Sequence, residues 1–200
     1  MMKEKIYINA ASQIAPGCEE PDYRQFITPM EARRMGKLMK RSLATSLTAL
    51  REAGIEHPDA IITGTFLGSV ENTEALLMSL TGVSDAPMKP TNFMQSTHNT
   101  VSSMIGIRTV SHGYNATYSH GLSSFESALL DALLQLELGE IENALVGLSD
   151  ETSETFSMML GKVGVESMDI ASSIVVSRKA ENALCRIADF SLSHGRAAFD

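Results

Sequence analysis

The stretch Asn115-Ala-Thr-Tyr-Ser-His-Gly-Leu-Ser-Ser-Phe-Glu-Ser-Ala-Leu129, continued by Val146-Gly-Leu-Ser-Asp-Glu151, decides how this chain is expected to fold. It opens with a short β-forming run, turns at Gly121 and enters a long apolar segment. The pattern predicts a strand–turn–helix–strand unit that presents a residue at a helix N-terminus. Backbone N–H groups there lower the pKa of a thiol and stabilise an oxyanion, which suits acyl transfer. Leu122 stands at the turn, and its side chain cannot act as a nucleophile.

The helix predicted from Ser123 to Leu138 is apolar around most of its circumference. A helix of this kind is normally buried between two layers, so we expect it to be covered on both sides. The segment also contains Glu126, Asp131 and Glu137, which excludes it as a membrane span.

The remaining periodic segments alternate between strands and helices with short connections. We expect strands at Ile6–Ala10, Ala60–Thr63, Asn115–His120, Ala144–Leu148, Ile170–Ser177 and Cys185–Leu192, and further helices from Thr28 to Ala53, Val70 to Leu80 and Thr97 to Arg108. This alternation predicts an α/β fold with a mostly parallel sheet and helices on both of its faces. We expect a single domain over residues 1–200.

Composition excludes several classes of protein. Of the 200 residues, 44% are hydrophobic and 20% charged, as in ordinary globular proteins. The net charge of −8 argues against a nucleic-acid partner, because such binding depends on lysine and arginine at phosphates. Cys18 and Cys185 form no disulfide or metal pattern. With no secretion signal at the start, we expect a cytoplasmic protein with no membrane partner, no metal and no cofactor.

Three further blocks carry a family resemblance. The segments Phe93–Ile107, Gly113–Ser119 and Ala144–Glu151, in this order around the turn, resemble the N-terminal half of the β-ketoacyl synthases of the thiolase superfamily. The resemblance extends from about Ile6 to Leu192. It implies a thiolase-like βαβαβαββ half-fold with a mostly parallel five-stranded sheet. In this family two such half-folds stack into five layers, and the helix after the turn lies in the middle layer.

The resemblance also implies a function. In this family the turn carries a cysteine nucleophile, and the aligned residue here is Leu122. The family's second half supplies two histidines for decarboxylation and condensation, and these 200 residues match only the first half. We therefore expect a non-catalytic, chain-length-factor-type subunit that works with an active 3-oxoacyl-[acyl-carrier-protein] synthase. Such pairs occur in type II fatty acid and polyketide systems, including aryl polyene and flexirubin pigment pathways. The alternative is an active synthase or acyltransferase completed by another chain.

We expect two interaction surfaces, one implied by the resemblance and one indicated by the charge pattern of a helix. The family dimerises through the strand before the nucleophile, so we expect this strand to pair with a second copy or with a ketosynthase-type partner. Here it contains Asn115, Ala116, Thr117, Tyr118, Ser119 and His120. Five basic residues of the first long helix fall within an arc of about 120° at 100° per residue, which predicts a basic strip. Such a strip suits an acidic acyl carrier protein, although it also fits an ordinary solvated face. The strip consists of Arg33, Arg34, Lys37, Lys40 and Arg41.

A serine hydrolase is the rival interpretation of the turn. Gly121-Leu-Ser-Ser-Phe125 partly matches a nucleophile elbow, with Ser123 followed by Asp150, Asp169 and His194 in serine–acid–histidine order. However, Ser123 and Glu126 also form a capping box, which needs no catalysis. His120 is similarly open to a catalytic or a packing role.

Other residues invite weaker functional interpretations. Gly64 and Gly68 follow a strand but lack a nucleotide-binding pattern, so we expect turn glycines. The chain has twelve methionines. Four of them lie near the family's acyl-channel and dimer segments: Met94, Met104, Met158 and Met159. Methionine adapts to variable apolar partners, and it also fills ordinary cores.

Overall fold

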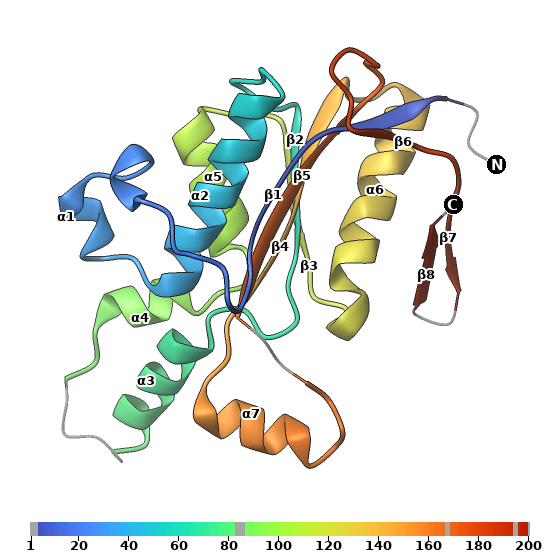
Figure 1. The fold of residues 1–200 in the computed structure, drawn as a ribbon. Helices are drawn as coiled ribbons and strands as arrows, with labels where there is room; N and C mark the ends of the chain where they lie inside the picture. The colour runs from blue at the N-terminus through green and yellow to red at the C-terminus, as the bar shows by residue number, and fades with distance from the viewer. Residues whose placement is uncertain (1–3, 83–86, 167–168, 194–195, 200) are drawn as a thin grey trace.

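The computed structural model describes residues 4–82, 87–166, 169–193 and 196–199 (Figure 1). Its centre is a six-stranded sheet with the strand order β3-β2-β4-β5-β1-β6. The strands are β1 (Ile6–Ile14), β2 (Ala60–Gly64), β3 (Tyr114–Tyr118), β4 (Asn143–Asp150), β5 (Ile170–Ser177) and β6 (Cys185–Ile187). The expected α/β class is confirmed.

The sheet is mixed, so the expectation of a mostly parallel five-stranded sheet is wrong. Strand β2 runs parallel to β3 and β4, whereas β5 is antiparallel to β4 and β1, and β6 is antiparallel to β1. A parallel neighbour needs a crossover, usually a helix packed on the sheet. The helix between β4 and β5, α7 (Glu154–Gly161), has no buried residue and lies beyond the end of the sheet (Figure 1). Strand β5 therefore returns antiparallel.

Helices cover both faces of the sheet, as expected. On one face lie α2 (Lys37–Glu52) and α5 (Thr100–Thr109), and on the other lies α6 (Ser124–Leu138) (Figure 1). Alternate strand residues feed two cores: Ile61 and Leu145 pack towards α2 and α5, whereas Ile62 and Val146 pack towards α6. This alternation follows from the period of two in a strand.

Three helices form a separate group at one end of the sheet (Figure 1). They are α3 (Val70–Leu80), α4 (Pro90–Gln95) and α7. The range of α3 is as predicted, but α4 and α7 were not expected. Only Val70 is buried in α3, and neither α4 nor α7 has a buried residue. These helices therefore extend outward from the core.

The helix expected from Thr28 to Ala53 is interrupted. Thr28 and Glu31 form a capping box at the start of α1 (Pro29–Ala32), but this helix lasts one turn, and Gly36 is the N-cap of α2. The cause is Gln95, whose side chain accepts from the Gly36 N–H (3.1 Å) and donates to the Arg34 carbonyl. A residue far along the chain thus takes backbone groups that a continuous helix would use internally.

The strand expected from Cys185 to Leu192 is also divided. Strand β6 pairs with β1, whereas β7 (Phe190–Ser193) pairs with β8 (Arg196–Phe199) in a separate two-stranded sheet. Between them, the Asp189 carboxylate accepts from the Phe190 N–H (3.0 Å). The chain therefore leaves the main sheet after Ile187. Within the described ranges, none of the helices is long and apolar enough to cross a bilayer.

Candidate functional site

The turn between β3 and α6 is held tightly against the end of β2. Gly121 adopts φ +62°, a left-handed conformation that glycine adopts without strain. A Cβ on Gly64 would lie 2.5 Å from the Ser124 backbone, so only glycine allows this close approach. The Ser124 hydroxyl accepts from the His120 N–H (2.9 Å) and lies 2.8 Å from the Thr65 carbonyl oxygen. Ser124 therefore anchors the turn.

Leu122 lies at the apex of this turn, in the short helix η2 (Gly121–Ser123), and is 71% exposed. The predicted capping box of Ser123 and Glu126 is wrong, because the Ser123 side chain makes no capping hydrogen bond. Ser123 has φ −102° and ψ 19°, since it closes a 3₁₀ turn, whereas a capping residue needs an extended backbone. The turn thus presents an aliphatic side chain to solvent at the start of α6.

His120 packs against the side of the turn. Its Nδ1 lies 3.0 Å from the Ser127 hydroxyl, and its ring meets the Tyr118 ring edge to face at a centroid distance of 5.5 Å. These contacts tie the imidazole to α6 and β3. They fit the packing role better than a catalytic one.

The two acids proposed as partners of Ser123 are engaged elsewhere. Asp150 accepts from the Thr65 hydroxyl (2.7 Å) and from the N–H groups of the next three residues, so it holds the loop after β2. Asp169 accepts from the Thr152 N–H (2.9 Å) and pairs with Lys37. His194 lies outside the described residues. The contacts of Asp150 and Asp169 thus lie at other loops, so these two acids give the hydrolase interpretation no support.

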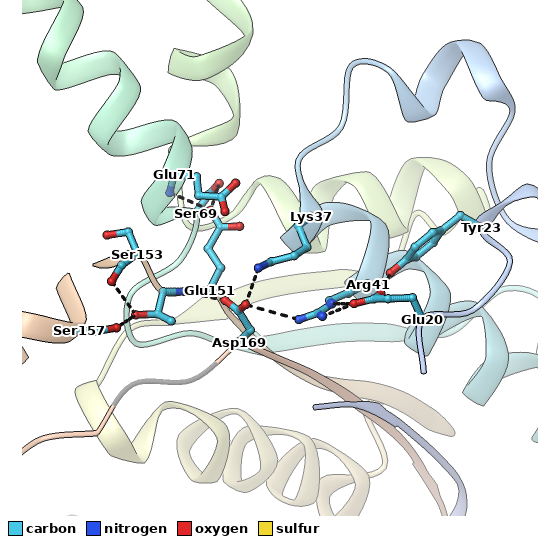
Figure 2. Close-up of polar contacts among 11 residues, drawn as sticks. Glu20, Tyr23, Lys37, Arg41, Ser69, Glu71, Glu151, Ser153, Ser157 and Asp169 are labelled. Carbon is cyan, nitrogen blue, oxygen red and sulfur yellow. Dashed lines mark hydrogen bonds and ion pairs between the residues drawn. The ribbon is translucent and has the colours of Figure 1, made fainter. Parts of the chain in front are cut away.

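Glu151 is a buried carboxylate that the sequence analysis did not single out. It is 1% exposed, and its Oε1 accepts from the Ser69 hydroxyl and the Glu71 N–H, both at 3.0 Å (Figure 2). The two donors belong to the first turn of α3, so Glu151 caps this helix from β4. Its Oε2 is buried with no hydrogen-bond partner among the described residues. Burial raises the pKa of this carboxyl group above its usual value.

A second polar cluster includes two residues of the expected basic strip. Lys37 forms an ion pair with Asp169, and Arg41 pairs with Glu20 and lies 3.9 Å from Asp169 (Figure 2). Burial alone would raise the pKa of Asp169, but the bonds to Lys37 and the Thr152 N–H outweigh it and hold this pKa below its usual value. These two cations are therefore not free to form a continuous docking strip.

The other three basic residues do not restore the strip. Arg33 and Arg34 precede α2, so the 100° spacing of one helix does not relate them to Lys40. Arg33 and Arg34 are exposed and Lys40 is half-buried. Docking of a carrier protein at these residues stays a prediction, without the geometry first expected for it.

Strand β3 lies at the edge of the sheet, where its outer side pairs with no strand among the described residues. The helix beside it, α6, packs on the sheet with one face and leaves Leu134 and Leu138 exposed on the other, at 50% and 75%. Only one side of α6 is therefore covered by the part of the chain that the structure describes. An open strand edge and an open apolar helix face thus adjoin each other.

The singled-out methionines lie mostly on the outer helices. Met94 on α4 and Met158 and Met159 on α7 are more than half exposed, whereas Met104 packs against the core beneath α2 and α5. Among the described residues, no group of three or more histidine, cysteine or acidic side chains could hold a metal ion.

Comparisons with known proteins agree with this geometry. The family model described as beta-ketoacyl synthase, N-terminal domain, matches residues 8–196. No curated protein matches the chain by sequence.

Several solved structures have a similar fold. The AntDE:AntF complex, a type II PKS acyl-carrier protein with its ketosynthase bound to the hexaketide, matches with a TM-score of 0.79 and 13% identity, over 94% of this chain and 68% of the other. The complex of the ketosynthase ApeO with its chain length factor ApeC from Xenorhabdus doucetiae matches with a TM-score of 0.71 and 21% identity, over 90% and 81%. The ishigamide ketosynthase/chain length factor gives 0.69 and 17%, over 93% and 66%.

Proposed function

This chain belongs to the beta-ketoacyl synthase N-terminal domain family, and on this basis we propose that it is a non-catalytic subunit of the chain-length-factor type. Its partner would be an active 3-oxoacyl-[acyl-carrier-protein] synthase, and the pair would extend acyl chains held on an acyl carrier protein. The pathway would be a type II fatty acid or polyketide system, with aryl polyene and flexirubin pigments as candidate products.

The observation that carries this proposal is Leu122. The turn has the features that a nucleophile elbow needs, namely a left-handed glycine, an exposed apex and the N-terminus of α6 behind it. A thiol placed there would be activated by the helix N-terminus. An alkyl side chain at the same place is neither a nucleophile nor a base. The scaffold of the site is thus retained without the reacting atom.

The open edge of β3 and the uncovered face of α6 support the proposal that a partner chain binds here. An edge strand without a covering element is a template for pairing with another chain. Two of the structures with a similar fold are complexes or pairs of a ketosynthase and a chain length factor. In the present proposal, β3 is the strand that meets the partner.

An active synthase completed by another chain is the second candidate. It is favoured by the intact geometry of the turn, where Gly64 and Ser124 hold β2 against α6. In this case another chain would supply the thiol and the histidines.

A reconstituted assay separates the two candidates. The chain is incubated with malonyl-loaded acyl carrier protein and an acyl primer, with and without the ketosynthase encoded nearest to its gene. We expect no condensation by the chain alone and a change in product length when it joins the ketosynthase. Replacing the active-site cysteine of the ketosynthase should abolish condensation. Condensation that survives this replacement, or that the chain performs alone, would refute the non-catalytic role.

A further inference from the structure

A cleft opens at the end of the sheet opposite the turn. Its volume is about 450 Å³, which falls in the usual range for small-molecule sites. Helices α2 and α5, which pack against each other on one face of the sheet, both end at this cleft (Figure 1). The segment 54–57, which precedes β2, completes its wall. Ser124 of the turn lies against Gly64, the last residue of β2, so the length of this strand separates the turn from the cleft.

Much of the wall of this cleft is apolar. Leu50 is buried, Val110 is 60% exposed, and three further apolar side chains are half-buried, namely Phe26, Leu47 and Ile55. Val110 follows α5 with φ +51°, a left-handed conformation that is unfavourable for a β-branched residue. Glycine or asparagine normally takes this conformation at a helix end. The helix end alone therefore does not explain the valine, which instead adds an apolar side chain to the cleft.

Two arginines and one glutamate belong to the same wall. Arg108 is already paired with Glu31 (2.7 Å), and the glutamate of the wall, Glu56, is exposed. The guanidinium of Arg51 lies over the Phe26 ring, with its Cζ 5.6 Å from the ring centroid, and forms no ion pair with any residue that the structure describes. Contact with the ring holds the guanidinium in place and leaves its N–H groups available to an anion. The last turn of a helix favours an arginine in any case, but this preference requires no apolar wall beside it.

The wall is held in shape without a ligand. The imidazole of His57 donates through Nδ1 to the Thr109 carbonyl oxygen (2.6 Å), because a carbonyl oxygen can only accept. The Ser111 hydroxyl donates to the Pro58 carbonyl oxygen (2.7 Å). These two bonds join the segment before β2 to the end of α5. The cleft is thus preformed, as small-molecule sites usually are.

We propose that this cleft binds a small amphipathic carboxylate, with its hydrocarbon part against Leu47, Leu50 and Val110 and its carboxylate on Arg51. A guanidinium can donate two parallel hydrogen bonds to one carboxylate. A cationic ligand would meet two arginines, and a wholly polar anion would leave the apolar wall in water. No residue of the turn or of β3 lines the cleft, so this binding site is independent of the proposed function.

Isothermal titration calorimetry with octanoate tests the class of ligand. Acetate carries the carboxylate without the hydrocarbon tail, and octylammonium carries the opposite charge on the same tail. We expect saturable binding of octanoate with a Kd below about 1 mM, and binding of both other compounds that is weaker by about tenfold or more. Octylammonium or acetate binding as tightly as octanoate would overturn the proposal. Octanoate that does not bind saturably at about 10 mM would also overturn it.

Removing the charge of Arg51 tests whether octanoate binds in this cleft. Arg51→Gln is compared with Arg186→Gln, which removes the same charge from an exposed position on β6 outside the cleft. Octanoate should bind Arg51→Gln more weakly by about tenfold or more and bind Arg186→Gln as it binds wild type. Circular dichroism checks that both variants are folded. Equal affinity of the two variants for octanoate would place its site elsewhere and overturn the proposal.

Val110→Gly tests the apolar wall without a loss of folding. Glycine adopts the left-handed conformation without strain, so thermal melts should show this variant to be at least as stable as wild type. Its affinity for octanoate should nevertheless fall by about threefold or more, because apolar surface is lost from the cleft. An affinity equal to that of wild type would contradict the contact between the hydrocarbon tail and this wall.

Discussion

Replacing Glu151 by alanine should loosen the attachment of α3 to the sheet. The carboxylate accepts two hydrogen bonds from the first turn of α3, and beyond Val70 that helix has no buried residue to hold it. A hydrogen bond to a charged group contributes about 1.5–3 kcal/mol, and removing the costly burial of the charge offsets part of the loss. We expect a net destabilisation of about 2 kcal/mol, which lowers the melting temperature by about 4–8 °C in a domain of this size.

Replacing Glu151 by glutamine separates the charge from the hydrogen bonds. The amide oxygen can still accept from Ser69 and Glu71, while the buried charge is removed. Because burial raises the pKa of Glu151, the folded protein holds this proton more tightly than the unfolded chain does. The contribution of the carboxyl group is therefore fully present below its unfolded value of about 4.5 and is lost as pH rises through the raised value. Relative to wild type, the glutamine variant should gain stability as pH increases.

Guanidinium unfolding at pH 5 and pH 8, followed by circular dichroism, measures this difference. Glu181→Ala, in an exposed turn, is the control and should change stability by less than about 0.5 kcal/mol. If the glutamine variant is as unstable as the alanine variant at pH 8, or loses stability relative to wild type between pH 5 and pH 8, the ionised carboxylate is needed as a charged cap. The reasoning from burial would then be refuted.

Three further predictions concern the ion pairs of Asp169, which directly precedes β5, and the turn between β3 and α6. Asp169→Asn, which removes the ion pair with the lysine at the start of α2, should cost about 1–2 kcal/mol at pH 7. Since the pKa of Asp169 is lowered, its contribution to stability is present above the unfolded value of about 3.8 and is lost as pH falls. The difference in unfolding free energy between wild type and Asp169→Asn, measured with urea, should therefore be smaller near pH 3 than at pH 7. A difference that stays constant with pH would contradict this. Gly64→Ala should lower stability by more than about 2 kcal/mol in thermal melts, because the new Cβ would lie 2.5 Å from the backbone of α6. Gly161→Ala is the control: a Cβ there would have nothing within 4 Å, so it should be neutral or slightly stabilising. Equal effects of the two substitutions would disprove the close approach at Gly64. Leu122→Cys should create a thiol with a pKa below the usual value of about 8.5, measured as the pH dependence of alkylation by iodoacetamide. Leu134→Cys, in the C-terminal half of α6, should not, and identical profiles would remove the helix N-terminus as an activating element.

The turn and its flanking elements could be predicted because each part carries its own local signal. The β-forming residues before His120, the glycine at the turn and the leucine-rich run after Ser124 appear in the structure as β3, η2 and α6 in this order. The choice of anchoring serine was not local. A capping pattern pointed to Ser123, whereas the proximity of β2 gives the anchoring role to Ser124.

The basic strip shows why a helical pattern alone is insufficient. The 100° spacing correctly places Lys37 and Arg41 on one side of α2, but it contains no information on what that side faces. Asp169, which is 132 residues from Lys37, meets both side chains and pairs with them inside the molecule. A surface predicted as free for docking is thus partly used for stability.

By itself, the sequence determined the α/β class, the presence of the elbow with Leu122 at its apex, and the similarity to the ketosynthase N-terminal half. These depend on the residue periodicity and turn chemistry of neighbouring residues, which are properties of short segments. Only the tertiary structure decided the mixed direction of the sheet, the break in the first helix at Gly36 and the burial of Glu151. Each of these depends on which distant groups meet in space, since a backbone or carboxylate group removed from water takes whatever partner the fold brings to it.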